Sequence, residues 1–138
     1  MKRVAFVFWF CGVAFASTED ADAQKDRVDC NNPITNIEIG ACLDRDLKAA
    51  DTELNRVYQI ARDTIERSDH LPPDLKAEWK VALRDAQRLW ISYRDADCRA
   101  LIKYEWWGGS GTSIAVLSCL LEKTQNRVSE LRARYDPR

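Results

Sequence analysis

The stretch TNIEIGACLDRDLKAADTELNRVYQIARDTIERS, residues 35–68, decides the fold class of this chain. It opens with Thr35, and Glu38 follows three residues later, a spacing typical of a capping box at the start of a helix. Apolar side chains then recur at steps of three and four residues: Leu43, Leu47, Ala50, Leu54, Tyr58, Ala61 and Ile65. Charged residues occupy the positions between them, so the stretch predicts an amphipathic helix over about residues 36–67.

A second helix is predicted after a pair of prolines. Pro72 and Pro73 cannot continue the first helix, but a proline suits the first turn of the next one, which we expect over about residues 74–106. The residues that recur at helical spacing form a stripe along one face of this helix. They are aromatic or aliphatic apart from one aspartate: Leu75, Trp79, Ala82, Leu83, Ala86, Trp90, Tyr93, Asp97 and Leu101.

A third helix follows a glycine-rich break. Thr112 or Ser113 can cap it, and we expect it over about residues 113–135. Its stripe consists of Leu117, Leu121, Thr124, Val128, Leu131 and Tyr135. No strand-like alternation competes with these patterns. The fold class is therefore predicted to be all-α, a small antiparallel three-helix bundle.

The N-terminus has the composition of a secretory signal. Two basic residues precede an apolar run that is too short to span a bilayer, and small residues follow it. Cleavage after Ala23 is favoured, with cleavage after Ala16 as the alternative. Residues 1–23 are thus predicted to be a signal peptide and residues 24–138 a single helical domain of a periplasmic or secreted protein.

Composition excludes several partners for the mature chain. Cys11 is not a lipid-attachment site because Phe10 precedes it, so no membrane anchor is expected after cleavage. Cleavage after Ala23 leaves about 115 residues, a small domain that buries roughly two-thirds of its unfolded surface. It removes two of 21 basic and three of 22 acidic residues, which leaves a neutral chain. Neutrality argues against nucleic acid or an anionic membrane surface as partner.

Four cysteines remain after processing, and an even number in a small exported domain predicts two disulfides. Cys98 and Cys119 lie at similar distances from the glycine-rich break, and Cys30 precedes the helix that contains Cys42. These positions favour Cys30–Cys42 and Cys98–Cys119, with Cys42–Cys98 as the rival pairing. No metal site is expected, because no C-x-x-C pair occurs and His70 is the single histidine.

Four polar residues are predicted to lie between the first two helices: Asp51, Asn55, Gln87 and Arg94. Asn55 and Gln87 are equidistant from the proline turn, and Asp51 falls within one turn of Arg94 across it. The first interpretation is a structural network that fixes helix register, because a buried charge requires a partner. The alternative is a binding or catalytic site.

Catalytic motifs are missing from the sequence. It contains no G-x-S-x-G or H-E-x-x-H motif, and the glycine cluster lacks the lysine of a phosphate loop. The carboxylate pairs Asp44/Asp46 and Asp95/Asp97 are two residues apart, so on a helix they point to different faces. We therefore expect a non-enzyme without a cofactor.

The glycine-rich break follows two adjacent tryptophans, which cannot both face one core. One interpretation is that one tryptophan caps the end of the bundle and the other shields the Cys98–Cys119 bridge. The functional interpretation is an aromatic anchor for a protein partner. The residues predicted to bind that partner are Tyr104, Glu105, Trp106, Trp107, Gly108 and Gly109.

Three segments together resemble the LprI N-terminal domain family of bacterial envelope proteins: DCNNPITNIEIGACLDRDLKAADTELNRVY (29–58), AQRLWISYRDADC (86–98) and SCLLEKTQNRVSEL (118–131). The shared pattern is a cysteine, a threonine–acid cap, a cysteine and A-D-x-x-L-N-x-x-Y. It continues with Q-x-x-W-x-x-Y-R-D-x-x-C, a glycine-rich stretch and C-x-x-x-x-T-x-x-R-x-x-x-L. The likeness covers nearly the whole mature chain.

The resemblance implies a lysozyme inhibitor, because the family takes its name from a mycobacterial lipoprotein that inhibits lysozyme. This chain departs from that namesake by lacking a lipid-attachment cysteine. The matched positions are mostly fold residues, so no inhibitory residue transfers from the family. The alternative is an accessory envelope module that binds peptidoglycan or an envelope protein without inhibiting anything. The sequence leaves the oligomeric state open.

Overall fold

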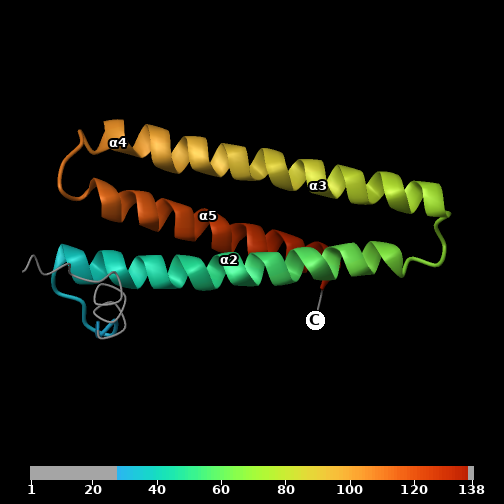
Figure 1. Cartoon of the computed structure of the whole chain (residues 1–138), viewed down its shortest axis with the longest axis horizontal. Helices are drawn as coiled ribbons and strands as arrows, with labels where there is room; N and C mark the ends of the chain where they lie inside the picture. Colours follow the sequence, from blue (N-terminus) through green and yellow to red (C-terminus); the bar gives the residue numbers. More distant parts are fainter. Residues whose placement is uncertain (1–27, 137–138) are drawn as a thin grey trace, which may run out of the picture.

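The computed structural model describes residues 28–136, so the predicted signal peptide lies outside the described part of the chain. Figure 1 shows long helices joined by a turn at each end of the molecule. The elements are α2 (Asn36–Glu66), α3 (Pro73–Asp95), the π-helical segment η1 (Ala96–Leu101), α4 (Ile102–Glu105) and α5 (Thr112–Tyr135). Segments η1 and α4 prolong α3, and no strand occurs in residues 28–136. The all-α class and the three-helix bundle are therefore confirmed.

Helix α2 begins with the predicted capping box. The Glu38 amide donates to the Thr35 hydroxyl at 3.2 Å, and the Glu38 carboxylate accepts from the Thr35 amide at 2.8 Å. The same carboxylate accepts from the Ile34 amide at 2.9 Å. The bonds from these two backbone amides hold the pKa of Glu38 below its ordinary value. The box thus fixes the chain that enters α2 as well as the first turn of the helix.

The buried face of α2 differs from the predicted stripe at two of its seven positions. It consists of Cys42, Leu47, Ala50, Leu54, Val57, Ala61 and Ile65. Leu43 and Tyr58, which the stripe includes, are only partly buried, and Cys42 and Val57 are buried in addition. The reason is that α2 packs closely along α5 and is also approached by α3, so two neighbours cover it from different sides.

Helix α3 departs furthest from its predicted stripe. Only Leu83 and Gln87 are buried within it, because α3 meets the other two helices along one narrow edge. Beyond it, η1 contains the wider turn of a π-helix, which shifts the phase of all later residues. Leu101 therefore faces solvent and Ile102 is partly buried in its place. The stripe residues predicted to be buried but found exposed are Leu75, Trp79, Ala82, Ala86, Tyr93 and Leu101.

Helix α5 begins one residue earlier than predicted. Its N-cap is Gly111, and neither Thr112 nor Ser113 has that role. The Thr112 hydroxyl is buried and has no hydrogen-bond partner in the described residues, so it does not cap the helix. The buried residues of α5 are Leu120, Thr124, Val128 and Leu131.

Both disulfides form with the favoured pairing. The Cα atoms are 5.6 Å apart in Cys30–Cys42 and 5.5 Å apart in Cys98–Cys119, so the rival Cys42–Cys98 pairing is wrong. Cys98 is fully buried and packs in one core cluster with Leu47 and Leu120. A native disulfide typically contributes about 2–4 kcal/mol. The Cys98–Cys119 bridge therefore attaches η1 to α5, at the place where α3 is otherwise weakly packed.

A second core cluster lies toward the proline turn, and an ion-pair network borders it. The cluster consists of Leu54, Val57, Ala61, Ile65, Leu83, Val128 and Leu131. Beside it, the Glu53 carboxylate accepts from Arg56 at 2.7 Å and also bonds Arg132 of α5. Hydrogen bonds from Arg56 and then Arg132 lower the pKa of Glu53 from 4.5 to about 2.

We predict that the free energy of unfolding falls less steeply with decreasing pH in Glu53→Gln than in the parent. The folded-state pKa is lowered, so the stabilisation by this carboxylate is complete above pH 4.5 and is lost as the pH falls toward about 2. Because 30% of the Glu53 side chain is exposed, solvent screening limits the effect to about 1 kcal/mol. Urea denaturation at a series of pH values measures it, and parallel profiles for parent and variant would contradict the prediction.

Candidate functional site

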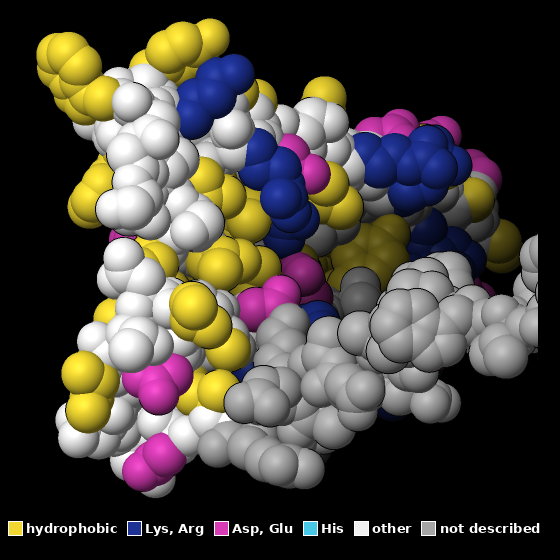
Figure 2. All heavy atoms as spheres, turned by 60° about the vertical axis from the view of Figure 1, so that its left-hand side comes forward, with side chains coloured by type: hydrophobic (Ala, Val, Ile, Leu, Met, Phe, Trp, Pro, Cys, Tyr) yellow, Lys and Arg dark blue, Asp and Glu magenta, His cyan; other side chains and the backbone are white. Residues whose placement is uncertain are grey.

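The turn between α4 and α5 exposes the aromatic residues that the sequence analysis singled out. Tyr104, Trp106 and Trp107 are 71%, 51% and 92% exposed. Figure 2 shows hydrophobic side chains gathered over this end of the molecule. We call residues 104–109 the aromatic tip. Neither tryptophan is buried, so neither closes the core of the bundle.

The two tryptophans differ in how their rings pack against the turn. The ring of Trp106 lies over Gly111, where an added Cβ would come within 2.8 Å of a ring carbon. Gly111 therefore gives Trp106 the room to fold back on the turn. Trp107, at 92% exposure, projects into solvent.

Trp107 occupies a backbone position that normally belongs to glycine. Its amide donates to the Tyr104 carbonyl at 3.2 Å, and the Gly108 amide donates to the Lys103 carbonyl at 3.0 Å. This pair of bonds is a Schellman motif, in which the residue at the position of Trp107 has a left-handed conformation. The φ angle of Trp107 is 55°, which is unfavourable for a bulky side chain. The turn thus holds an exposed tryptophan at a conformational cost.

Two isoleucines that the sequence analysis missed lie at the same end of the bundle. Ile34 and Ile37 are 80% and 83% exposed, and they stand at the start of α2, whose first turn lies at the end of the molecule that carries α4 (Figure 1). The Ile34 backbone is fixed by its bond to Glu38. The sequence could have predicted the exposure of Ile37, because this residue lies outside the apolar stripe of α2.

The aromatic tip also contains charge. The Lys103 amine lies 4.9 Å from the centre of the Tyr104 ring, a cation–π contact. Glu105 is exposed and forms no ion pair with any residue of the described chain. The tip therefore offers aromatic surface together with one uncompensated carboxylate.

Arg94 is the centre of the predicted polar cluster. Its guanidinium donates at 3.0 Å both to the Asp51 carboxylate of α2 and to the Thr124 hydroxyl of α5. It also lies 5.2 Å from the centre of the Trp90 ring. Only 12% of the Arg94 side chain is exposed. One side chain of α3 is thereby bonded to both neighbouring helices.

Gln87 and Asn55 do not bond each other. The Gln87 carbonyl accepts from Arg127 of α5 at 3.1 Å. Asn55 is exposed, and its side chain makes no hydrogen bond within residues 28–136. Asp51, Gln87 and Arg94 therefore belong to contacts that span all three helices, whereas the cluster was predicted between the first two alone.

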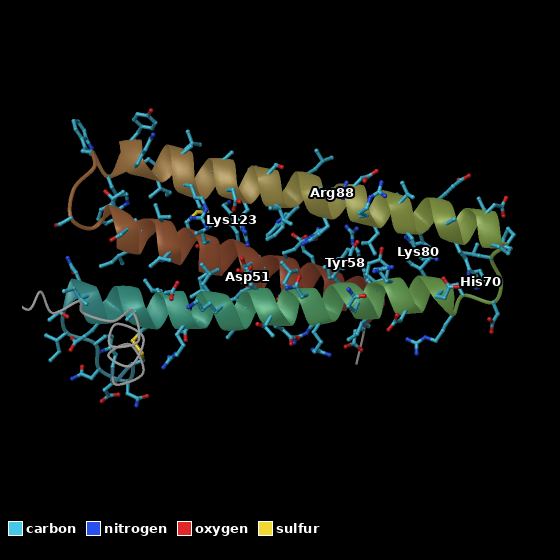
Figure 3. All side chains as sticks on the ribbon, viewed as in Figure 1. Asp51, Tyr58, His70, Lys80, Arg88 and Lys123 are labelled. Carbon is cyan, nitrogen blue, oxygen red and sulfur yellow. A yellow bond between two sulfur atoms is a disulfide. The ribbon has the colours of Figure 1, made fainter. Side chains whose placement is uncertain are left out.

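Metal ligation finds no support in the described residues. Asp97, Cys98 and Cys119 have ligand atoms within 4.8 Å of one another, but both sulfurs are joined in a disulfide and offer no thiolate. Asp97 instead pairs with Lys123 at 2.9 Å. His70 lies in the proline turn, away from these groups (Figure 3).

Comparison with known proteins supplies the family. A family model described as Lysozyme inhibitor LprI matches residues 30–131. The chain belongs to the LprI family. Uncharacterized protein R02472 of Rhizobium meliloti (strain 1021) is 36% identical over 118 residues, which cover 83% of this chain and 84% of the relative. No solved structure matches.

Many of the residues that suggested the LprI family join the helices in this structure. Asp51, Gln87, Trp90, Arg94, Thr124 and Arg127 form the inter-helix polar network, and the four cysteines form the two bridges. The aromatic tip lies between the matching motifs, in the glycine-rich stretch. The LprI pattern in this chain therefore describes a scaffold, and the tip is the surface that this scaffold exposes.

We predict that Trp107→Asn leaves the free energy of unfolding unchanged or raises it by up to about 1 kcal/mol, because asparagine tolerates a positive φ. Trp107→Val removes the same ring but puts a β-branched residue at this φ angle, and should be less stable than the parent. Urea denaturation measures both variants. A large loss of stability in the asparagine variant would show that the ring packs against the bundle.

We predict that Arg94→Met lowers the free energy of unfolding by about 2–3 kcal/mol, because it removes charge-assisted bonds to two helices. Arg88→Met on the same helix is the matched control. Arg88 is exposed and its side chain forms no hydrogen bond or ion pair in the described residues, so this change should stay within about 0.5 kcal/mol of the parent. Similar losses in both variants, by urea denaturation, would contradict a structural role for Arg94.

Proposed function

We propose that this LprI-family protein is an exported lysozyme inhibitor that binds its target through the aromatic tip. One observation supports the tip most strongly: Trp107 is 92% exposed and is held at a φ angle that favours glycine. Backbone strain retained at an exposed aromatic residue is typical of a ligand contact. The target class comes from the family description, Lysozyme inhibitor LprI.

The chemistry of the tip suits such a target. Tryptophan and tyrosine supply large contact areas and are frequent binding hot spots. C-type lysozymes are basic enzymes with a cleft that receives sugar rings, so a projecting indole can enter the cleft and Glu105 can face the basic surface. Ile34 and Ile37, at the same end, extend the apolar contact area. The proposed mechanism is therefore a steric block by a binding protein, not a reaction.

Export is part of the proposal. It is supported by the signal-like residues 1–23 and by the two disulfides, which persist in an oxidising compartment. The described helices include none that is long and apolar enough to cross a membrane. The signal-like segment and the disulfides together support a location in the periplasm or outside the cell.

The alternative function is a non-inhibitory accessory module that binds peptidoglycan or an envelope protein. The same tip would serve such a module, since an exposed aromatic ring can also stack on the face of a sugar. The alternative differs in one observable respect, because it leaves lysozyme activity on cell walls unchanged.

We predict that the protein slows clearance of a cell-wall suspension by lysozyme, and that Trp107→Ala raises the half-inhibitory concentration at least tenfold. Leu89→Ala is the matched control, because Leu89 is 72% exposed on α3 outside the tip. It should inhibit like the parent.

Two results would overturn the proposal. Parent and Trp107→Ala proteins that inhibit equally would remove the tip from the mechanism. No inhibition of any lysozyme type, together with retention of the parent on wall fragments, would favour the accessory module.

A further inference from the structure

A second surface with different chemistry lies along the seam between α2 and α3. Two adjacent hollows, each of about 390 Å³, share Tyr58 and Arg84 in their linings. Figure 3 shows Tyr58 and Lys80 in the space between the two helices. On α3 the lining extends from Ala77 to Arg94, about 25 Å along the helix axis. We call this surface the seam groove.

Cations dominate the polar lining of the seam groove. Its basic residues are Arg62, Lys80, Arg84, Arg88 and Arg94, and its one acidic residue is Asp51. Asp51 is already bonded to Arg94. The groove therefore has no acidic side chain of its own to balance the other four cations.

Two of those four cations find partners outside the lining. Lys80 pairs with Glu66 at 2.7 Å, and Arg84 pairs with Asp85 at 2.8 Å. The side chains of Arg62 and Arg88 form neither an ion pair nor a hydrogen bond with any residue the structure describes. Both are exposed. The seam groove thus presents two uncompensated guanidinium groups, which bind carboxylates well because their donors match the two oxygens.

The rest of the lining is apolar apart from the amide side chains of Asn55 and Gln87. It includes Leu54 and Tyr58 from α2 and Ala77, Val81 and Ile91 from α3. Val81 and Ile91 are 46% and 39% exposed, although they lie on the side of α3 that faces α2. Apolar surface beside a row of cations on α3 is complementary to a ligand that is itself amphipathic and acidic.

We infer that the seam groove binds an acidic amphipathic helix of a partner protein. Lys80, Arg84 and Arg88 succeed one another at intervals of one helical turn, and carboxylates four residues apart on a partner helix have the same spacing. Apolar residues between those carboxylates would cover Val81 and Ile91. A helix of about 17 residues matches the length of the groove, in the common helix-in-groove mode of recognition.

Charge separates this partner from the target of the aromatic tip. A basic enzyme such as a C-type lysozyme is repelled by the seam groove and attracted by Glu105 at the tip. An acidic glycan would match the cations but would leave the apolar lining exposed. Helix binding by the groove is therefore independent of the proposed lysozyme inhibition by the tip.

The test uses a fluorescein-labelled helical peptide of 17 residues with glutamate at every fourth position and leucines beside them, titrated with the full mature protein and read by fluorescence anisotropy. We expect saturable binding that weakens with added salt. Arg62→Gln combined with Arg88→Gln should weaken it at least tenfold. Arg45→Gln combined with Arg134→Gln removes the same charge from exposed positions outside the groove and should change it less than twofold.

Two comparisons keep the result specific to the groove. Val81→Asp adds a carboxylate within the apolar lining and should also weaken binding at least tenfold, with circular dichroism confirming that both groove variants remain helical. A peptide with glutamine in place of glutamate should bind at least tenfold more weakly than the acidic one. Absence of peptide binding at up to 1 mM protein, unchanged affinity in both groove variants, or equal affinity for a sulfated oligosaccharide would overturn the inference.

Discussion

The guanidinium group of Arg94 bonds the Asp51 carboxylate of α2 and the Thr124 hydroxyl of α5 from its place on α3. The rest of the bundle depends on this contact because α3 buries only Leu83 and Gln87. A helix with so little apolar contact gains its register from specific polar bonds instead, since a one-turn shift would leave a largely buried cation without its acceptors. The Gln87–Arg127 bond and the cation–π contact of Arg94 with Trp90 also help to fix the register of α3.

The segment directly after Arg94 in the chain holds the aromatic tip in place. The π-helical turn brings Cys98 into the core, where its bridge to Cys119 attaches the end of α3 to α5. Lys123 reinforces this attachment, and its bonds to the Tyr93 hydroxyl and to Asp97 raise the pKa of its amine. A turn anchored so closely on both sides can retain a strained residue such as Trp107, because relaxation would require movement of bonded neighbours.

The formal net charge of the sequence is only −1, yet the chain carries two surfaces that suit partners of opposite charge. The aromatic tip combines exposed rings with an unpaired carboxylate, and the seam groove combines an apolar lining with two unpaired guanidinium groups. Both surfaces are possible because α3 is held by a few polar bonds and a disulfide, which leaves most of its apolar residues uncovered. If α3 packed closely against α2 along its whole length, the seam groove would be buried.

The sequence by itself determined the helices, their caps at Thr35 and the prolines, and the all-α class, because these depend on spacing within three or four residues. It also favoured the two disulfides, although chain order alone left a rival pairing open. Only the tertiary structure decided which positions of α2 are buried, the exposure of Leu101, the glycine cap at Gly111 and the presence of exposed Ile34 and Ile37 at the same end of the bundle as the tip. It alone showed that Arg127 donates to Gln87 and that the side chains of Arg62 and Arg88 lack partners among the described residues. Such features depend on which helix approaches from which side and on a π turn that local periodicity does not encode, so they arise only when the three helices pack together.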